Sequence, residues 1–163
     1  MSKIAISNWL LYNFLVAFSF YWTANLLLWF PWSINAVLGM TIMLTVGPFL
    51  WAWGVYMCLV RFPGRKVIEA VAINALIFLV VAAAFDLVFY GFIRNAMEEL
   101  YHPTTFYAYA FLIVLPAAEG FIFRKKFKRE GKPVRMHDML YISLMGLVSL
   151  ALLIIIIKFN ITI

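Results

Sequence analysis

One aspartate, Asp86, stands inside a long apolar run in the stretch VVAAAFDLVFYGFIRNAMEELYHP. Because a carboxyl group is costly to place in lipid, an ionisable residue in such a run is a functional candidate. As a structural group, the Asp86 carboxylate would accept hydrogen bonds from Tyr90, from Arg94 or from an asparagine such as Asn25. As a functional group, it would carry a proton or bind a cation near the outer face of a membrane.

Three more polar residues extend this candidate site along the apolar runs. Asn74 lies in the same run as Asp86, and Glu69 and Glu119 each lie near one end of a run. Each glutamate is expected to reach toward flanking basic residues and to pair with one of them, namely Arg65, Lys66, Arg124 or Lys125. If these two runs pack antiparallel, Asp86 would mark the outer mouth of a polar route and the glutamates its inner mouth, with the Asn74 amide between them. The candidate intramembrane polar site therefore contains Asp86, Tyr90, Arg94, Asn74, Glu119 and Glu69.

The polar segment after this run contains a weak metal-binding pattern. The letters ELYH, from Glu99 to His102, form a Glu-x-x-His unit, which is one half of the ligand pattern of carboxylate-bridged di-iron bundles. Only one such unit is present, and Pro103 follows it directly. We therefore expect an exposed loop or a short cap helix here, and we keep Glu98, Glu99 and His102 as a weak candidate site for a divalent metal ion. The sequence predicts no cofactor and no catalytic residues.

The composition places all these residues in a membrane protein. Of 163 residues, 66% are hydrophobic and 12% are charged, whereas a soluble domain needs roughly a quarter of its residues charged. Five apolar runs are long enough to cross about 30 Å of hydrocarbon: residues 9–30, 34–60, 67–93, 105–123 and 139–159. They must be helices, because backbone groups find no water in lipid and the runs lack the alternation of barrel strands. The predicted fold is an all-α bundle of five transmembrane helices, one membrane domain over residues 1–163, with a tight turn at residues 31–33.

The basic residues predict the orientation of the bundle. Eleven of the thirteen Lys and Arg residues precede the first run or lie between the second and third or the fourth and fifth runs, and only Arg94 and Lys158 lie on the other side. Short basic segments stay in the cytoplasm. We therefore expect a multi-pass protein of the cell membrane, inner or plasma, with a cytoplasmic N-terminus and an external or periplasmic C-terminus.

The most basic segment, RKKFKREGKPVRMHD, begins where the fourth run ends. A polybasic segment beside a span is attracted to anionic lipid headgroups by about 1 kcal/mol per basic residue. This favours a role in lipid contact and topology over nucleic-acid binding, with a docking site for an acidic soluble partner as the alternative. The predicted lipid contacts are Arg124, Lys125, Lys126, Lys128 and Arg129.

Small and hydroxylated residues at helical spacing predict close contacts between helices. They form one stripe in the first run and a second in the next, and the alternative role for them is a path for a polar solute. The stripe of the first run is Asn8, Tyr12, Ser19 and Thr23, and that of the second is Thr41 and Thr45, followed by Gly47 and Gly54.

Three functions are compatible with these patterns. The first is a non-enzymatic membrane component that works as a homo-oligomer or as a subunit of a membrane complex. The second is a small proton- or cation-coupled carrier or channel that uses Asp86. The third is a membrane-embedded enzyme acting on a lipid or quinone, against which stands the lack of a convergent nucleophile and base or of a metal triad. The first needs the fewest assumptions.

Overall fold

A computed structural model describes residues 3–64, 66–129 and 132–159, and no strand occurs within these ranges. The first predicted span is a continuous helical rod made of α1, a π-helical segment η1 and the short helix α2, and the third span likewise ends in a π segment, η2. A 3-10 turn, η3, and a short helix, α6, flank the fourth. The elements are α1 Lys3–Ala24, η1 Asn25–Trp29, α2 Phe30–Ile34, α3 Ala36–Leu59, α4 Val67–Val88, η2 Phe89–Ile93, η3 Met97–Tyr101, α5 Pro103–Ile122, α6 Arg124–Arg129 and α7 Met136–Lys158.

Five of these helical stretches are long and apolar enough to cross a membrane, which confirms the predicted helical bundle. They are Lys3–Ile34, Ala36–Leu59, Val67–Ile93, Pro103–Ile122 and Met136–Lys158. Their surfaces are rich in exposed apolar side chains such as Phe49, Phe92 and Phe121. A soluble bundle would place polar residues there, so lipid is the expected surrounding of these helices.

The turn between the first two spans lies two residues later than the sequence predicts. Pro31 lies in the first turn of α2, directly after the π segment η1, and the chain reverses at Asn35 in an extended conformation with φ −148° and ψ 116°. Asn35 caps α3, because its Oδ1 accepts from the N–H groups of Val37 and Leu38 at 2.9 and 3.1 Å. The predicted turn at Pro31–Ser33 is therefore wrong, and an asparagine cap rather than the proline sets the reversal.

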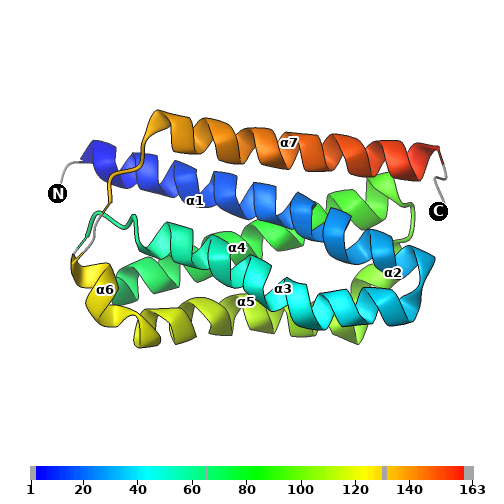
Figure 1. Cartoon of the computed structure of the whole chain (residues 1–163), viewed down its shortest axis with the longest axis horizontal. Coiled ribbons are helices and arrows are strands. Elements are labelled where there is room, and N and C mark those ends of the chain that lie inside the picture. Colours follow the sequence, from blue (N-terminus) through cyan, green and yellow to red (C-terminus); the bar gives the residue numbers. More distant parts are fainter. Residues whose placement is uncertain (1–2, 65, 130–131, 160–163) are drawn as a thin grey trace.

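Four spans form a bundle, and the fifth lies outside it. In the bundle α4 packs against α1 and α5, and α3 also packs against α1 and α5. The last span, α7, packs against α1 and its extension η1, running in the same direction as α1 (Figure 1). The core is largely aromatic, with Trp9, Trp22, Phe78 and Phe89 fully buried.

Basic residues gather at the end of the molecule where the chain begins and where α6 lies (Figure 1). We call this the basic end. Its described basic residues are Lys3, Arg61, Lys66, Arg124, Lys125, Lys126, Lys132 and Arg135. The opposite end holds α2, η3, Arg94 and Lys158. The positive-inside rule predicts that the basic end faces the cytoplasm.

Candidate intramembrane polar site

Asp86 on α4 is held by two tyrosines from two other helices. Tyr21 of α1 donates its hydroxyl to Oδ1 at 2.7 Å, and Tyr109 of α5 donates to Oδ2 at 2.6 Å. Hydrogen bonds to an ionised or ionisable group are stronger than neutral ones, and they are short here. The carboxyl group of Asp86 therefore ties α1, α4 and α5 together. We call these three residues the tyrosine clamp.

Arg94, a predicted partner of Asp86, is engaged elsewhere. Both of its terminal nitrogens bond to Glu99, with Nη2 donating to Oε1 at 2.8 Å. The π turn of η2 explains the difference, because the Arg94 N–H bonds to the carbonyl of Phe89 at 2.8 Å instead of that of Tyr90. The extra residue in this turn rotates Arg94 off the face of α4 that carries Asp86. Among the described residues, no hydrogen bond joins Asp86 to Tyr90 either.

Asn25, the third predicted partner, also bonds elsewhere. Its Nδ2 donates to the carbonyl of Tyr21 at 3.0 Å, at the start of the π segment η1. The two π segments meet through the rings of Trp29 and Phe89, whose centroids lie 5.4 Å apart. π-helical segments are rare in proteins, and those that occur are often found at functional sites. Two of them lie close to the tyrosine clamp.

The predicted site does not include Tyr21 or Tyr109. The position of a tyrosine along its helix could nevertheless have indicated that it lies at the same level as Asp86. Tyr109 lies six residues after the start of α5 at Pro103, and Asp86 lies seven residues before the end of η2 at Ile93. Antiparallel neighbours place such positions at the same level. Matching the depth of each tyrosine to that of Asp86 would have identified Tyr109.

A second group of polar side chains lies closer to the basic end. Asn74 of α4 donates its Nδ2 to Oδ1 of Asn13 on α1 at 2.6 Å, and Asn13 donates to the carbonyl of Trp9 at 2.9 Å. Both asparagines are fully buried. The Trp9 indole donates to the carbonyl of Cys58 on α3 at 2.8 Å. This network joins α1, α3 and α4 in the interior.

Glu119 of α5 is buried beside this network with only 6% of its surface exposed. Its Oε2 has no hydrogen-bond partner among the described residues, and the same is true of Oδ1 of Asn74. The Cys58 thiol lies near both the Asn74 amide and Glu119. The predicted pairing of Glu119 with Arg124 or Lys125 is not found, because Glu119 faces inward from α5 while these two side chains are exposed beyond its end.

Glu69 forms the predicted ion pair with a flanking basic residue at the surface. It does not line a polar route through the interior. Its Oε1 pairs with Nζ of Lys66 at 3.2 Å, and half of its side chain is exposed. Its other predicted partner, Arg65, lies outside the described residues. Glu69 and Glu119 therefore do not share one mouth of a polar path.

The polar groups form two levels, and α1, α4 and α5 each contribute at least one polar side chain to both levels. Asn74 and Asp86 are twelve residues apart on α4, which corresponds to about 18 Å along the helix. Between the levels lie buried apolar side chains from the same three helices: Val16, Phe78 and Leu112. The predicted continuous route is thus interrupted by an apolar layer.

The predicted packing stripe of α1 meets α7. Ser19 donates its hydroxyl to the carbonyl of Ile142 at 2.5 Å, and the hydroxyls of Thr23 and Ser149 lie 3.0 Å apart. Gly146 lets the helices approach, since a Cβ at this position would lie 2.5 Å from Oγ of Ser19. The predicted stripes do not include Gly146 or Ser149. These residues follow Ile142 at intervals of four and three residues, a spacing that is typical of one face of a packed helix.

Other members of the predicted stripes have different surroundings. Tyr12 is buried, and the guanidinium of Arg61 lies 5.1 Å from the centre of its ring. Gly47 is buried against Leu28. Asn8 is exposed and packs against no other helix of the described chain, so its place in a packing face stays a prediction. It lies in the second turn of α1, where no neighbouring helix covers that face.

The weak metal candidate is occupied by other interactions. Glu99 pairs with Arg94, and Nδ1 of His102 lies 2.9 Å from Oγ1 of Thr104 and accepts from the N–H of Thr104 at 3.4 Å, where it caps α5. Glu98 is exposed. Nowhere in residues 3–64, 66–129 and 132–159 do three His, Cys, Asp or Glu side chains converge as metal ligands.

The predicted lipid contacts all lie in α6 at the basic end. Lys126 sits over the ring of Tyr56 at 5.2 Å, and Arg124 and Lys125 are exposed. Lys128 and Arg129 belong to α6, and their side chains lie outside what the structure describes.

Comparison of the chain with family models, with curated protein sequences and with solved structures finds no match.

Proposed function

We propose that the chain is a non-enzymatic membrane component that works as an oligomer or as a subunit of a membrane complex. The observation that carries this proposal is the use of polar side chains inside the bundle. Asp86, Asn74, Ser19 and Thr23 all form hydrogen bonds between helices. An enzyme would instead need such groups to converge on a substrate cavity.

A hydroxylated stripe on the outside of α3 supports association with another membrane helix. The hydroxyl of Thr41 donates to the carbonyl of Val37 at 2.8 Å, and that of Thr45 donates to the carbonyl of Thr41 at 2.7 Å. Both side chains are exposed, whereas Gly47 and Gly54 of the same helix face the bundle. Short side chains with internally bonded hydroxyls allow a second helix to approach closely. The stripe predicted for packing is therefore available to a neighbour outside the chain.

The mass of the particle extracted from the membrane tests the proposal. The parent protein, isolated in native membrane discs or mild detergent, should be heavier than one chain by native mass spectrometry. Thr41→Phe combined with Thr45→Phe should reduce it to a single chain, because two bulky rings prevent close approach. A parent protein that is monomeric and free of other subunits at every concentration would contradict the proposal.

The control places the same two rings on another outward face. Leu76 and Val80 of α4 are also four residues apart, and they are 61% and 56% exposed. Leu76→Phe combined with Val80→Phe should leave the assembly intact. If both double variants dissociate equally, the effect comes from added bulk and not from the α3 stripe.

A second candidate, a proton- or cation-coupled carrier, is favoured by Glu119. A buried carboxylate without a partner is costly, so a proton or a cation would stabilise it. Asp86, which accepts hydrogen bonds from Tyr21 and Tyr109, would supply a second carboxyl group at the other polar level, beyond an apolar layer that must open for transport.

Ion flux in liposomes tests this candidate. Glu119→Gln and Asp86→Asn should each abolish a flux seen with the parent protein, while Glu69→Gln, at the exposed Lys66 pair, should retain it. The absence of any proton, sodium or potassium flux from the parent across a range of pH would eliminate the carrier.

A further inference from the structure

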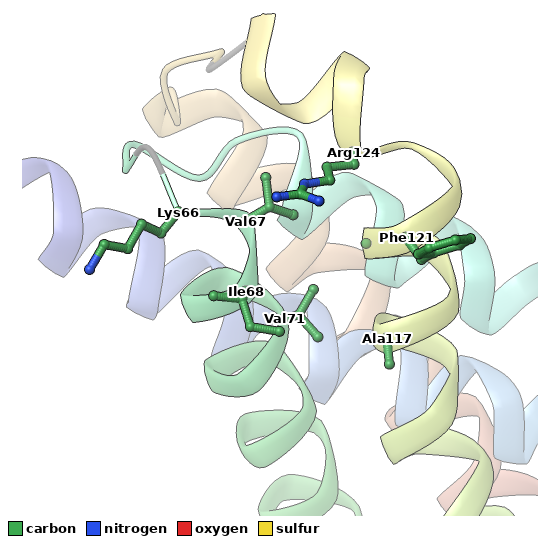
Figure 2. A pocket seen from close by; sticks show the side chains of 8 residues that line it. Lys66, Val67, Ile68, Val71, Ala117, Phe121 and Arg124 are labelled. Atoms are coloured by element: carbon green, nitrogen blue, oxygen red, sulfur yellow. The ribbon is translucent and has the colours of Figure 1, made fainter.

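A cavity opens between two helices at the basic end, where α4 begins and α5 ends. Its volume is about 550 Å³, and most of its lining is apolar (Figure 2). Val67, Ile68 and Val71 line it from α4, and Ala117 and Phe121 line it from α5. The cavity thus lies where two spans meet one surface of the expected bilayer.

The cavity faces outward and does not lead into the bundle. Ile68 is 72% exposed and Phe121 is 85% exposed, so both walls project toward the surroundings. At the back of the cavity the two helices touch at Gly120, where an added Cβ would run into the side chain of Val71. A ligand would therefore enter from the side of the lipid.

One cationic group lies at the rim of the cavity without a partner. The side chain of Arg124, the first residue of α6, points toward the first turn of α4 (Figure 2). No hydrogen bond or ion pair of Arg124 occurs among the described residues. Lys66, also at the rim, extends away from the cavity in the same view and pairs with Glu69. Among the described residues that line the cavity, the free charge is therefore that of Arg124.

We propose that this cavity binds one anionic phospholipid, an inference that goes beyond the proposed function. The phosphate would bond to the Arg124 guanidinium, which matches two phosphate oxygens with two parallel N–H groups. The first turn of α4 has no side-chain cap at Lys66, so its N–H groups add a favourable dipole for the same anion. The upper part of an acyl chain would lie against Ile68, Val71 and Ala117.

The combination of apolar walls and one guanidinium selects a lipid over a soluble anion. A small phosphate would leave the apolar walls in contact with water, and a neutral lipid would leave the guanidinium unpaired. An anionic phospholipid satisfies both. The site therefore differs from the diffuse attraction expected for a polybasic segment, which needs no cavity.

Lipid binding by native mass spectrometry tests the proposal with two matched variants. Phosphatidylglycerol should bind the parent protein with a stoichiometry of one at low concentration, and more tightly than phosphatidylcholine with the same acyl chains. Arg124→Gln should weaken phosphatidylglycerol binding about tenfold, the loss expected for one charged hydrogen-bond pair. Lys132→Gln removes the same charge at the basic end, at an exposed residue outside the cavity lining, and should change binding less than twofold.

Ala117→Trp fills the cavity without changing the charge and should also weaken phosphatidylglycerol binding, with thermal unfolding showing that the variant is folded. Equal losses for Arg124→Gln and Lys132→Gln, or full binding by a folded Ala117→Trp, would overturn the proposal in favour of diffuse attraction. Equal binding of phosphatidylcholine would overturn the role of the guanidinium. Glycerol phosphate that competes at the same concentration as the lipid would overturn the role of the apolar walls.

Discussion

Tyr109 on α5 donates a hydrogen bond of 2.6 Å to Asp86 on α4, and these two residues are 23 positions apart in the chain. With Tyr21 of α1 on the other carboxylate oxygen, the bond makes Asp86 the meeting point of three helices. Breaking it should loosen all three. Variants of Asp86, Tyr21 and Tyr109 should therefore differ from the parent protein in their free energy of unfolding.

Asp86→Leu should lower the free energy of unfolding by about 1–3 kcal/mol, because it leaves two tyrosine hydroxyls without their acceptor. Asp86→Asn should cost less than half as much, since an amide can still accept from one hydroxyl and donate to the other. Equilibrium unfolding in one detergent measures both. A leucine variant as stable as the parent protein would show that the tyrosine clamp does not hold the helices.

Tyr21→Phe and Tyr109→Phe test the same clamp from the other side. Each should destabilise the parent protein by about 0.5–1.5 kcal/mol, and each should have a much smaller effect in the Asp86→Leu background. Thermodynamic coupling of this kind identifies an interaction between side chains. Purely additive effects would mean that the hydroxyls act independently of Asp86.

Gly146→Ala should destabilise the contact between α1 and α7 by about 1–3 kcal/mol, because the added methyl group would overlap Ser19. The Ser19 Cα, which is backbone, lies 2.8 Å from the Cβ position, so the helices must move apart. Gly47→Ala is the control: its Cβ would meet Leu28 at 3.4 Å, an ordinary contact. Thermal unfolding should separate the two variants, and equal melting temperatures would disprove the close approach at Gly146.

Glu119→Met should leave the stability unchanged or raise it, because it replaces a buried group that has an unpaired oxygen with an apolar one of similar volume. Glu69→Met, at an exposed ion pair, should change the free energy of unfolding by less than about 0.5 kcal/mol. A strong destabilisation by Glu119→Met would reveal that a bound ion, water or partner normally satisfies Glu119.

The orientation of the bundle is open to chemical labelling in intact cells. A cysteine at Glu98 should react with an impermeant thiol reagent, and a cysteine at Lys125 should react only after the cells are opened. The native Cys58 is fully buried, so it should give little background. The reverse pattern would place the basic end outside.

Helix length and apolar composition could be read from the sequence because each span must satisfy its own backbone in lipid. The partners of Asp86 could not be predicted from the sequence, because Tyr21 is 65 positions away and resembles any other aromatic residue of an apolar run. The π turn at η2 also escaped prediction. A regular helix, which the sequence analysis assumed, would place Arg94 near Asp86. In the structure the turn contains one additional residue, and Arg94 pairs with Glu99 instead. Local spacing predicts contacts within a helix, whereas contacts between helices depend on depth and rotation.

The position of α7 on the outside of α1 has a consequence for how the protein is made. α7 follows the four helices of the bundle in the chain, so it is synthesised after them, and it packs on α1, the helix most distant from it in sequence. Until that moment the Ser19 hydroxyl has no Ile142 carbonyl to bond, and the same holds for Thr23 and Ser149. Until α7 is made and packs, α1 therefore exposes a hydroxylated face, which α7 covers in the folded chain.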